Sequence, residues 1–330
     1  MKNSFLGLEL SLLGVGTYLG EPDSQTSAGY IEVIKKAQEF GINVIDTAIV
    51  YRYMQSERDI AQVLKQKPRD GFFISTKGGY VPYDAMSGMH PQEYIHKNFI
   101  KSGLVDASLN PYHSLNARFI DWCFNKSLEN LGVKSIDVYF LHNPEEALSS
   151  LSRAEFLSQI RACFEYLEGK IKEGSLRFYG IATWRGLIAK ESDSSHVDIF
   201  EVFKAAREVG GQDHGFRFVQ LPYNVGMLDA TTANSQRGKS ILKACQELGL
   251  YVYTSASIFQ GRVIGRLNNE FKKLMGTDSD AVASLRFVIS TPGVGTALVG
   301  MSKLKHFEEN VRVLEMGKLK PEEFRALMDV

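Results

Sequence analysis

The sequence has few cysteines, no excess charge of one sign and no long apolar run. Lys+Arg and Asp+Glu number 38 each, so no global field attracts nucleic acid or an anionic membrane surface. No apolar stretch approaches the ~20 residues that span a bilayer, and the segment from Met1 to Gly16, broken by Glu9 and three glycines, makes a poor signal peptide. We therefore expect a cytoplasmic protein without nucleic-acid or membrane partners.

The three cysteines lie far apart and cannot all pair with one another. Each falls within an apolar pattern of helical spacing, so we interpret all three as reduced core thiols: Cys123, Cys163 and Cys245.

What the chain does contain is a repeated unit, a short β-rich run followed by a longer stretch of helical spacing. Such alternation is typical of parallel βα units, and eight β-rich runs favour a closed barrel. With 330 residues, 44% of them hydrophobic, the chain suits one large core. We predict a single α/β domain over residues 1–330, a (β/α)8 TIM barrel. The predicted strands are Ser11 to Tyr18, Gly41 to Asp46, Gly71 to Lys77, Ile136 to His142, Arg177 to Thr183, Phe216 to Tyr223, Leu250 to Ser255 and Thr296 to Met301.

The stretches between these runs place apolar residues at steps of three and four, as in Tyr30, Val33, Ile34 and Ala37. This spacing predicts helices packed on the outside of the barrel. Glycines before several strands match helix C-caps.

One connection is longer than the pattern requires. Between Lys77 and Ile136 one helix suffices, and residues 116–131 supply it, with Ser114 as the expected N-cap. Residues 78–113 remain as an insertion after the third strand, which predicts a pocket wall or lid at the barrel mouth. Three histidines in it lack metal-like spacing, so we expect no metal site: His90, His96 and His113.

Three consecutive predicted strands end in an ionisable side chain: Asp46, Lys77 and His142, with Tyr51 on the loop after the first of them. Each alone has an ordinary structural interpretation as a cap, a surface lysine, a rim histidine or a packing ring. Such groups cost free energy at the end of an apolar strand unless they are paired or reach a solvated mouth. Because active sites of barrels lie at the C-terminal ends of the strands, their coincidence favours a catalytic site.

Reduction of a carbonyl by hydride needs these residue types together. The alkoxide that forms must be protonated by a general acid. A free phenol has a pKa of about 10, and a neighbouring ammonium favours its ionisation. Lowering that pKa by about three units needs roughly 4 kcal/mol of differential interaction. We therefore expect Lys77 to acidify Tyr51, Asp46 to keep Lys77 charged, and His142 to orient the carbonyl oxygen.

The order and spacing of these residues resemble the aldo/keto reductases, and the resemblance extends over nearly the whole chain. The segments that carry it are Gly41 to Tyr51, Ser56 and Glu57, Ile74 to Lys77, Tyr139 to Pro144, Gly169 to Gly174, Arg177 to Thr183, Val219 to Asn224, Phe259 to Gly261, Gly300 to Lys303, and Glu309 with Asn310.

The resemblance implies an oxidoreductase that interconverts a carbonyl and an alcohol with NADP(H), or alternatively NAD(H), extended across the barrel mouth. It assigns the catalytic tetrad to Asp46, Tyr51, Lys77 and His142, with Tyr51 as general acid/base. Tyr53 is the second candidate for that role, two residues off the family spacing.

The resemblance also implies ligand contacts. The cofactor contacts are Thr17, Tyr18, Asp46, Thr183, Gln220, Ser255, Ser257, Ile258, Gln260, Gly261, Ser302, Lys303, Glu309 and Asn310; the substrate contacts are Tyr18, Trp184 and His142.

Three positions depart from the family pattern. Trp184 stands where many members have the asparagine of a Ser-Asn pair, Ser255 replaces an aromatic residue that stacks on the nicotinamide, and His306 replaces an arginine or glutamine near the adenine ribose.

Other interpretations remain open from the sequence. A Rossmann dinucleotide site at Gly14 to Gly20 has its third glycine one residue late. A Schiff-base aldolase would use Lys77 as nucleophile, but Asp46 beside it would keep the amine charged. A cofactor-binding regulatory subunit with little turnover shares the same barrel. The aromatic pocket suits sugars, steroids and aryl aldehydes equally, so the small-molecule substrate and the oligomeric state stay open.

Overall fold

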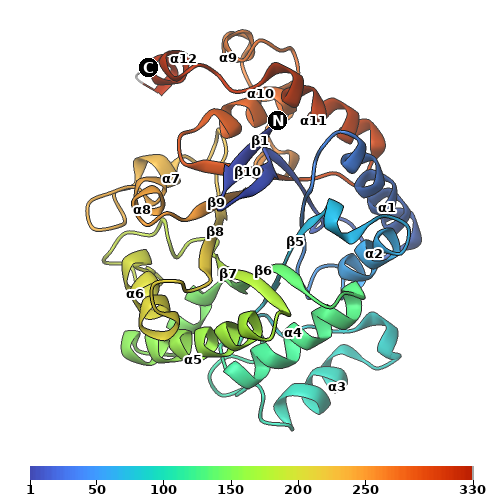
Figure 1. The fold of residues 1–330 in the computed structure, drawn as a ribbon, viewed down its shortest axis with the longest axis vertical. Coiled ribbons are helices and arrows are strands. Elements are labelled where there is room, and N and C mark those ends of the chain that lie inside the picture. The colour runs from blue at the N-terminus through green and yellow to red at the C-terminus, as the bar shows by residue number, and fades with distance from the viewer. Residues whose placement is uncertain (329–330) are drawn as a thin grey trace.

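The computed structural model describes residues 1–328 and is built on an eight-stranded closed barrel of parallel strands (Figure 1), in the order β10-β3-β4-β5-β6-β7-β8-β9. This confirms the predicted TIM barrel. The barrel strands are β3 (Leu13–Gly16), β4 (Val44–Asp46), β5 (Phe73–Gly78), β6 (Ile136–His142), β7 (Leu176–Ala182), β8 (Phe216–Pro222), β9 (Tyr251–Ser255) and β10 (Val294–Gly300).

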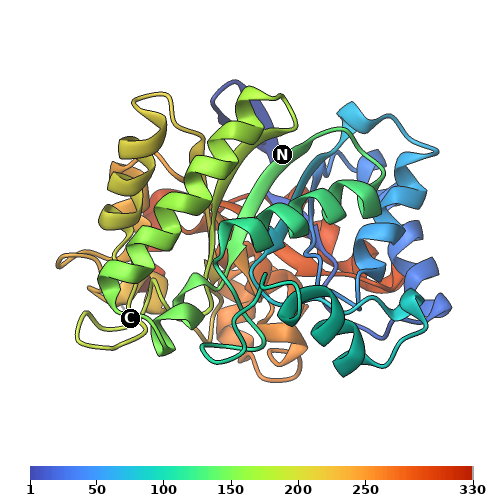
Figure 2. The same cartoon turned by 90° about the horizontal axis from the view of Figure 1, so that it is seen from below.

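An N-terminal hairpin that the sequence analysis did not predict precedes the barrel. Its antiparallel strands are β1 (Lys2–Phe5) and β2 (Leu8–Ser11), joined by Leu6 and Gly7, both at positive φ. The Phe5 ring packs edge-on against Phe218, with ring centres 5.6 Å apart. In Figure 2 the hairpin lies at the opposite edge of the molecule from the loops that follow the C-terminal ends of the strands. The hairpin therefore closes the bottom of the barrel.

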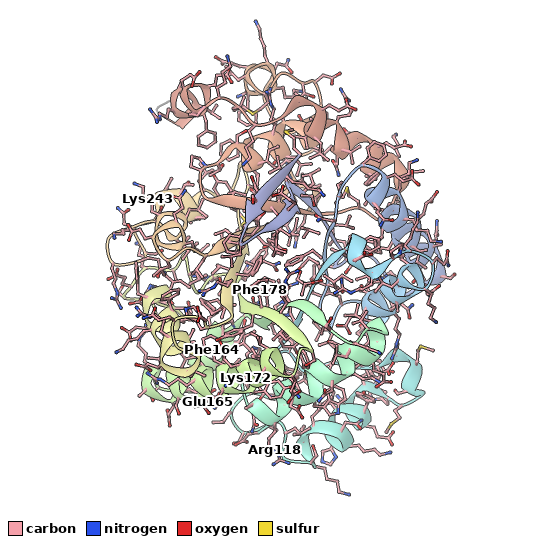
Figure 3. The ribbon with its side chains drawn as sticks, in the orientation of Figure 1. Arg118, Phe164, Glu165, Lys172, Phe178 and Lys243 are labelled. Carbon is pink, nitrogen blue, oxygen red and sulfur yellow. The ribbon has the colours of Figure 1, made fainter. Side chains whose placement is uncertain are left out.

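Two hydrophobic cores follow from the alternation of side chains along each strand. A larger core fills the layer between strands and helices, and α5 (Arg153–Lys172) shows how a helix joins it: Phe164 is buried and points toward the strands, whereas Glu165 is exposed and points outward (Figure 3). The smaller core fills the barrel interior, and its buried members are Leu10, Val44, Phe73, Val138, Phe140, Ala182, Phe218, Tyr251, Tyr253 and Leu298.

The helices surround the strands (Figure 1). In α1 the predicted stripe of Tyr30, Val33, Ile34 and Ala37 is buried, and Asp23 caps the helix by accepting a hydrogen bond from the backbone N–H of Thr26. The helices are α1 (Ser24–Glu39), α2 (Gln55–Leu64), α3 (Pro91–Ile95), α4 (Ala117–Leu131), α5 (Arg153–Lys172), α6 (Ile199–Gly210), α7 (Asp229–Thr232), α8 (Ile241–Glu247), α9 (Asn269–Leu274), α10 (Asp280–Ser290), α11 (Leu304–Met316) and α12 (Pro321–Met328).

Residues 79–113, called here the 79–113 segment, lie between β5 and α4 and form a folded unit. They contain α3 and a π-helical turn at His96–Ile100. Phe99 is buried against α4, with its ring centre 4.6 Å from that of Trp122. A two-pronged ion pair joins Asp84 of the segment to Arg58 of α2, at 2.7 and 2.8 Å. The segment is thus anchored to the neighbouring helices α2 and α4.

The N-cap prediction for α4 was wrong by two residues. Asn116, not Ser114, caps the helix, because its side-chain oxygen accepts the backbone N–H of Arg118 at 2.9 Å. The Ser114 hydroxyl instead accepts the backbone N–H of Asn116.

The three cysteines are buried and unpaired. Over residues 1–328, no group of three or more His, Cys, Asp or Glu side chains is arranged to hold a metal ion. Within the same residues, no helix has the length and apolarity required to traverse a bilayer.

Candidate active site

The strand register brings three of the predicted catalytic residues to the same end of the barrel. Asp46 ends β4, Lys77 is the next-to-last residue of β5, and His142 ends β6, and these strands are neighbours. Asp46, Tyr51 and His142 line a cavity of about 770 Å³ at this mouth, while Lys77 is fully buried beside Asp46.

Lys77 and Asp46 form an ion pair inside the barrel. The lysine Nζ lies 2.6 Å from Asp46 Oδ2 and also donates to the carbonyl oxygen of Thr47 at 2.7 Å. Asp46 Oδ1 accepts hydrogen bonds from Ser75 Oγ at 2.6 Å and Gln220 Nε2 at 3.0 Å. Burial lowers the pKa of Lys77, and the negative charge of Asp46 opposes that effect. The carboxylate is therefore held in place by three side-chain donors.

Tyr51 stands over this pair. Lys77 Nζ lies 4.9 Å from the centre of the Tyr51 ring, and the ring also contacts Tyr18 and His142 edge-on, at centre distances of 5.0 and 5.9 Å. The second candidate, Tyr53, is half-exposed at the rim and packs against Tyr83. Of the two tyrosines, Tyr51 is the one that contacts Lys77 and His142.

The turn after Tyr51 is strained. Arg52, Tyr53 and Met54 all have left-handed backbone angles, with φ between 49° and 69°, and each such residue costs about 1–2 kcal/mol. The buried Arg52 guanidinium holds this turn, since it pairs with Asp59 at 2.5 Å and donates to Ser27 Oγ at 2.8 Å. The buried ion pair thus fixes the backbone from which Tyr51 projects.

The expected acidification of Tyr51 is wrong for this structure. Burial raises the pKa of Tyr51 well above 10, and the negative charge of Asp46 raises it further. Lys77 directs its hydrogen bonds to Asp46 and Thr47, so its charge is largely compensated by the carboxylate. Tyr51 is consequently a neutral phenol at neutral pH.

His142 is also neutral. Burial lowers the pKa of its imidazole well below 6.5, and the nearby Lys77 charge lowers it further. Its ring lies between those of Tyr51 and Tyr80, and the Tyr80 ring is nearly perpendicular to it at 5.0 Å. A neutral imidazole retains one N–H donor for an oxygen atom in the cavity.

Three predicted substrate contacts, Tyr18, Trp184 and His142, all line the cavity. The backbone of Trp184 is held by Glu145, whose Oε1 accepts the backbone N–H groups of Trp184, Arg185 and Gly186 at 2.8 to 3.1 Å. Sequence reasoning missed Glu145, although it follows His142 closely as part of Asn-Pro-Glu. It also missed several wall residues: Leu19, Val50, Tyr80, Val81, Pro82, Tyr83, Pro91, Ile95, Tyr112 and Asn143.

The predicted cofactor contacts divide into two sets. Those that line the cavity are Thr17, Tyr18, Asp46, Thr183, Gln220, Ser255, Ser257, Ile258 and Gln260. The others lie outside the cavity lining: Gly261, Ser302, Lys303, Glu309 and Asn310. Glu309 accepts a hydrogen bond from Ser279 Oγ at 2.6 Å, and Asn310 is buried.

Two backbone features beside the cavity suit a phosphorylated ligand. In the loop after β9, Ala256, Phe259 and Gln260 have left-handed φ angles, and the backbone N–H groups of Ser257 and Ile258 have no hydrogen-bond partner among residues 1–328. Lys303 precedes α11, and within the described chain no side chain caps that helix start. Free N–H groups in a turn and at a helix N-terminus bind anions. The donor set therefore fits a dinucleotide.

A family model described as the aldo/keto reductase family matches residues 12–281 and 264–330. Among curated proteins, the chain is 26% identical over 282 residues to the NADH-specific methylglyoxal reductase of Escherichia coli, covering 82% of this chain and 72% of that protein.

Solved structures show the same fold. Aldo-keto reductase AKR11C1 from Bacillus halodurans, in its holo form, superimposes with a TM-score of 0.69 at 21% identity, covering 100% of this chain and 96% of that one. An aldo/keto reductase from Klebsiella pneumoniae in complex with NADP and acetate has a TM-score of 0.64 at 18% identity, covering 97% and 90%.

Proposed function

Because this chain belongs to the aldo/keto reductase family, we propose that it reduces a small carbonyl compound with a nicotinamide cofactor and that Tyr51 is the general acid. The observation that carries the proposal is the cluster at the barrel mouth: a neutral Tyr51 phenol, a neutral His142 imidazole and the buried Lys77–Asp46 pair around one cavity.

The bound nicotinamide would supply the hydride that adds to the carbonyl carbon. The side chains of the protein orient and protonate the carbonyl oxygen of the substrate. His142 donates its N–H to the carbonyl oxygen and orients it, and Tyr51 gives its phenolic proton to the developing alkoxide. The Lys77 ammonium beside Tyr51 stabilises the phenolate that results, and Asp46 keeps that ammonium charged.

The protonation state of Tyr51 favours the reductive direction of the reaction. A general acid must carry its proton before the reaction, and burial holds Tyr51 in the protonated form. In the oxidative direction Tyr51 would have to start as a phenolate to accept the alcohol proton, which its raised pKa disfavours near neutral pH. We therefore propose that the chain is a better reductase than alcohol dehydrogenase.

The cofactor would lie along the predicted contacts. Gln220 donates one hydrogen bond to Asp46, which leaves its carbonyl oxygen for a carboxamide N–H, and Thr183 adds a hydroxyl. The loop Ser257 to Gly261 would hold the pyrophosphate. Ser302 and Lys303 would meet a phosphate on the adenine ribose at the start of α11, which favours NADP(H) over NAD(H). Glu309 and Asn310 would contact the adenine.

We further propose that the 79–113 segment is an insertion that forms one wall of the substrate site. Its members Tyr80, Tyr83 and Tyr112 line the cavity opposite the loop after β9. Tyr18 and Trp184 complete an aromatic wall.

The test is the fall of NADPH absorbance with a panel of aldehydes and ketones. Tyr51→Phe removes the proton donor and is expected to lower kcat by about 10²- to 10⁴-fold while NADPH binding, followed by fluorescence, is retained. Tyr53→Phe is the matched comparison and should keep kcat within a few-fold. Equal losses in both variants, or a wild type without turnover on the whole panel, would refute the assignment. Covalent trapping of substrate on Lys77 by borohydride would indicate an aldolase instead.

A further inference from the structure

The ring of His142 has neighbours that the proposed mechanism does not use. They come from the start and the end of the 79–113 segment, where Tyr80 and His113 form an antiparallel bridge. This bridge fixes both ends of the segment beside the last residue of β6. The bridge places Tyr80 and His113 next to His142, which orients the substrate carbonyl in the proposed mechanism.

His113 holds the backbone of His142. Its Nε2 lies 2.8 Å from the His142 carbonyl oxygen, and its imidazole is buried and neutral, so Nε2–H is the donor. A glycine is required between them, because a Cβ added at Gly79 would lie 2.7 Å from that carbonyl oxygen and 2.9 Å from the Nε2 of His113. Gly79 also has φ +148°, which L side chains rarely adopt. The close approach of the segment to His142 is therefore built into the backbone.

Tyr80 packs against the imidazole ring of His142. Its aromatic ring meets the His142 imidazole at 5.0 Å and 89°, and the His113 ring at 5.2 Å and 81°. Its hydroxyl accepts a hydrogen bond from Asn143 Nδ2 at 2.9 Å and donates to Glu146 Oε1 at 3.2 Å. Asn143 can turn its amide toward Tyr80 because its own backbone is left-handed, with φ 44°.

The His142 ring itself depends on this packing. Its described contacts are edge-on aromatic ones with Tyr51 and Tyr80, and among residues 1–328 no side chain or backbone group forms a hydrogen bond to either ring nitrogen. Because no protein group among these residues holds either ring nitrogen, the orientation of the imidazole ring depends on the rings packed against it. Tyr51 changes its protonation state during the proposed reaction, whereas the hydroxyl of Tyr80 stays paired with Asn143 and Glu146, so Tyr80 is the invariant aromatic wall of the imidazole.

We propose that Tyr80 is a positioning residue that fixes the orientation of His142, and that the 79–113 segment thereby takes part in carbonyl reduction as well as enclosing the substrate. This inference rests on the proposed function. Edge-on aromatic contacts of this kind carry enough energy that losing one should lower kcat by about three- to tenfold, with little change in cofactor affinity.

Two substitutions distinguish the contribution of the Tyr80 ring from that of its hydroxyl. Tyr80→Leu removes the ring and should lower kcat about three- to tenfold, with the dissociation constant of NADPH unchanged. Tyr80→Phe keeps the ring and should restore most of the rate. Met86→Ala, on the same segment but 74% exposed and outside the cavity lining, is the control for general disturbance of the segment. Wild-type kcat in Tyr80→Leu, or a parallel loss of NADPH binding, would overturn the proposal.

A measurement on the unaltered chain does not depend on turnover, and a variant is needed only to assign its signals. NMR of ¹⁵N- and ¹³C-labelled histidine, with the His142 signals assigned by their loss in His142→Gln, should show a rigid ring. A ring that exchanges between orientations as freely as exposed His90 would overturn the inference even if the chain reduces carbonyls. A rigid His142 ring in a chain without turnover would leave the positioning intact and refute only the proposed function.

Discussion

Replacement of Lys77 by methionine removes a cation that is fully buried. At the observed Nζ to Oδ2 distance of 2.6 Å, the attraction to Asp46 is about 6 kcal/mol at the effective dielectric constant of a protein site. Desolvation of both charges offsets much of this gain, but removing one partner leaves an uncompensated charge and typically costs about 3–5 kcal/mol. We expect Lys77→Met to lie near the lower end of this range, because Asp46 keeps its hydrogen bonds from Ser75 and Gln220.

The double substitution distinguishes charge coupling from packing. Asp46→Asn together with Lys77→Met leaves no charge at the site, and the asparagine keeps the volume and an acceptor for Ser75. The double variant should therefore recover about 2 kcal/mol or more of the stability lost by Lys77→Met. Its activity should stay low, because Tyr51 has lost the ammonium that stabilises its phenolate. The second substitution would then restore stability without restoring turnover.

Urea unfolding measures the free energies of all four proteins in this cycle. Circular dichroism and tryptophan fluorescence must give coincident transitions for the values to be used. If the double variant is destabilised by the sum of the two single effects, the carboxylate and the ammonium are not coupled. In that case the 2.6 Å contact contributes nothing to the fold beyond packing.

Three further outcomes follow from the site. The pKa of Tyr51 is raised well above 10 and that of His142 is lowered well below 6.5, so kcat for reduction should show no inflection from either group near neutral pH, and its decline at alkaline pH should follow deprotonation of Lys77, whose pKa burial lowers; an inflection near pH 7 that is lost in His142→Gln would contradict this. Burial lowers the pKa of His113 to about 4, so the unfolded chain binds a proton between pH 6.5 and 4 that the folded chain does not. Stability is thus fully present above pH 6.5 and is lost toward pH 4 by up to about 3 kcal/mol, and His113→Gln should lose this part of the pH dependence in unfolding experiments. Lys303→Ala should raise the dissociation constant of NADPH about tenfold without changing that of NADH; equal changes would show that Lys303 does not meet the ribose phosphate.

The barrel and the ion pair could be predicted from the sequence because both depend on local pattern. Asp46, Lys77 and His142 each end a short apolar run, and neighbouring parallel strands bring such ends together whatever the loops do. The hairpin at the bottom was missed because the apolar residues between Lys2 and Ser11 are interrupted by Gly7 and Glu9 and form no run. Its fold depends on Leu6 and Gly7 adopting positive φ and on contacts of Phe5 with distant strands.

The features that escaped the sequence analysis depend on long-range packing. Nothing local to Glu145 shows that its carboxylate will receive three backbone N–H groups from residues 184–186. The contact of Tyr80 with His142 requires Gly79 and a left-handed Asn143 at the same time. The direction of the pKa shift at Tyr51 was also misjudged, because it depends on how deeply the ring is buried, which residue order does not reveal.

The hairpin under the barrel bears on where the protons of the reaction come from. Phe5 and Leu8 pack against the smaller core, whose apolar side chains fill most of the interior between the bottom of the barrel and the Lys77–Asp46 pair, together with the hydrogen-bonded hydroxyls of Tyr251 and Thr296. In the proposed reaction, the phenol of Tyr51 would regain its proton after each cycle from the cavity at the mouth, which Tyr51 lines. Proton supply and product release would then both occur through the barrel mouth, so a molecule bound at the mouth would block both.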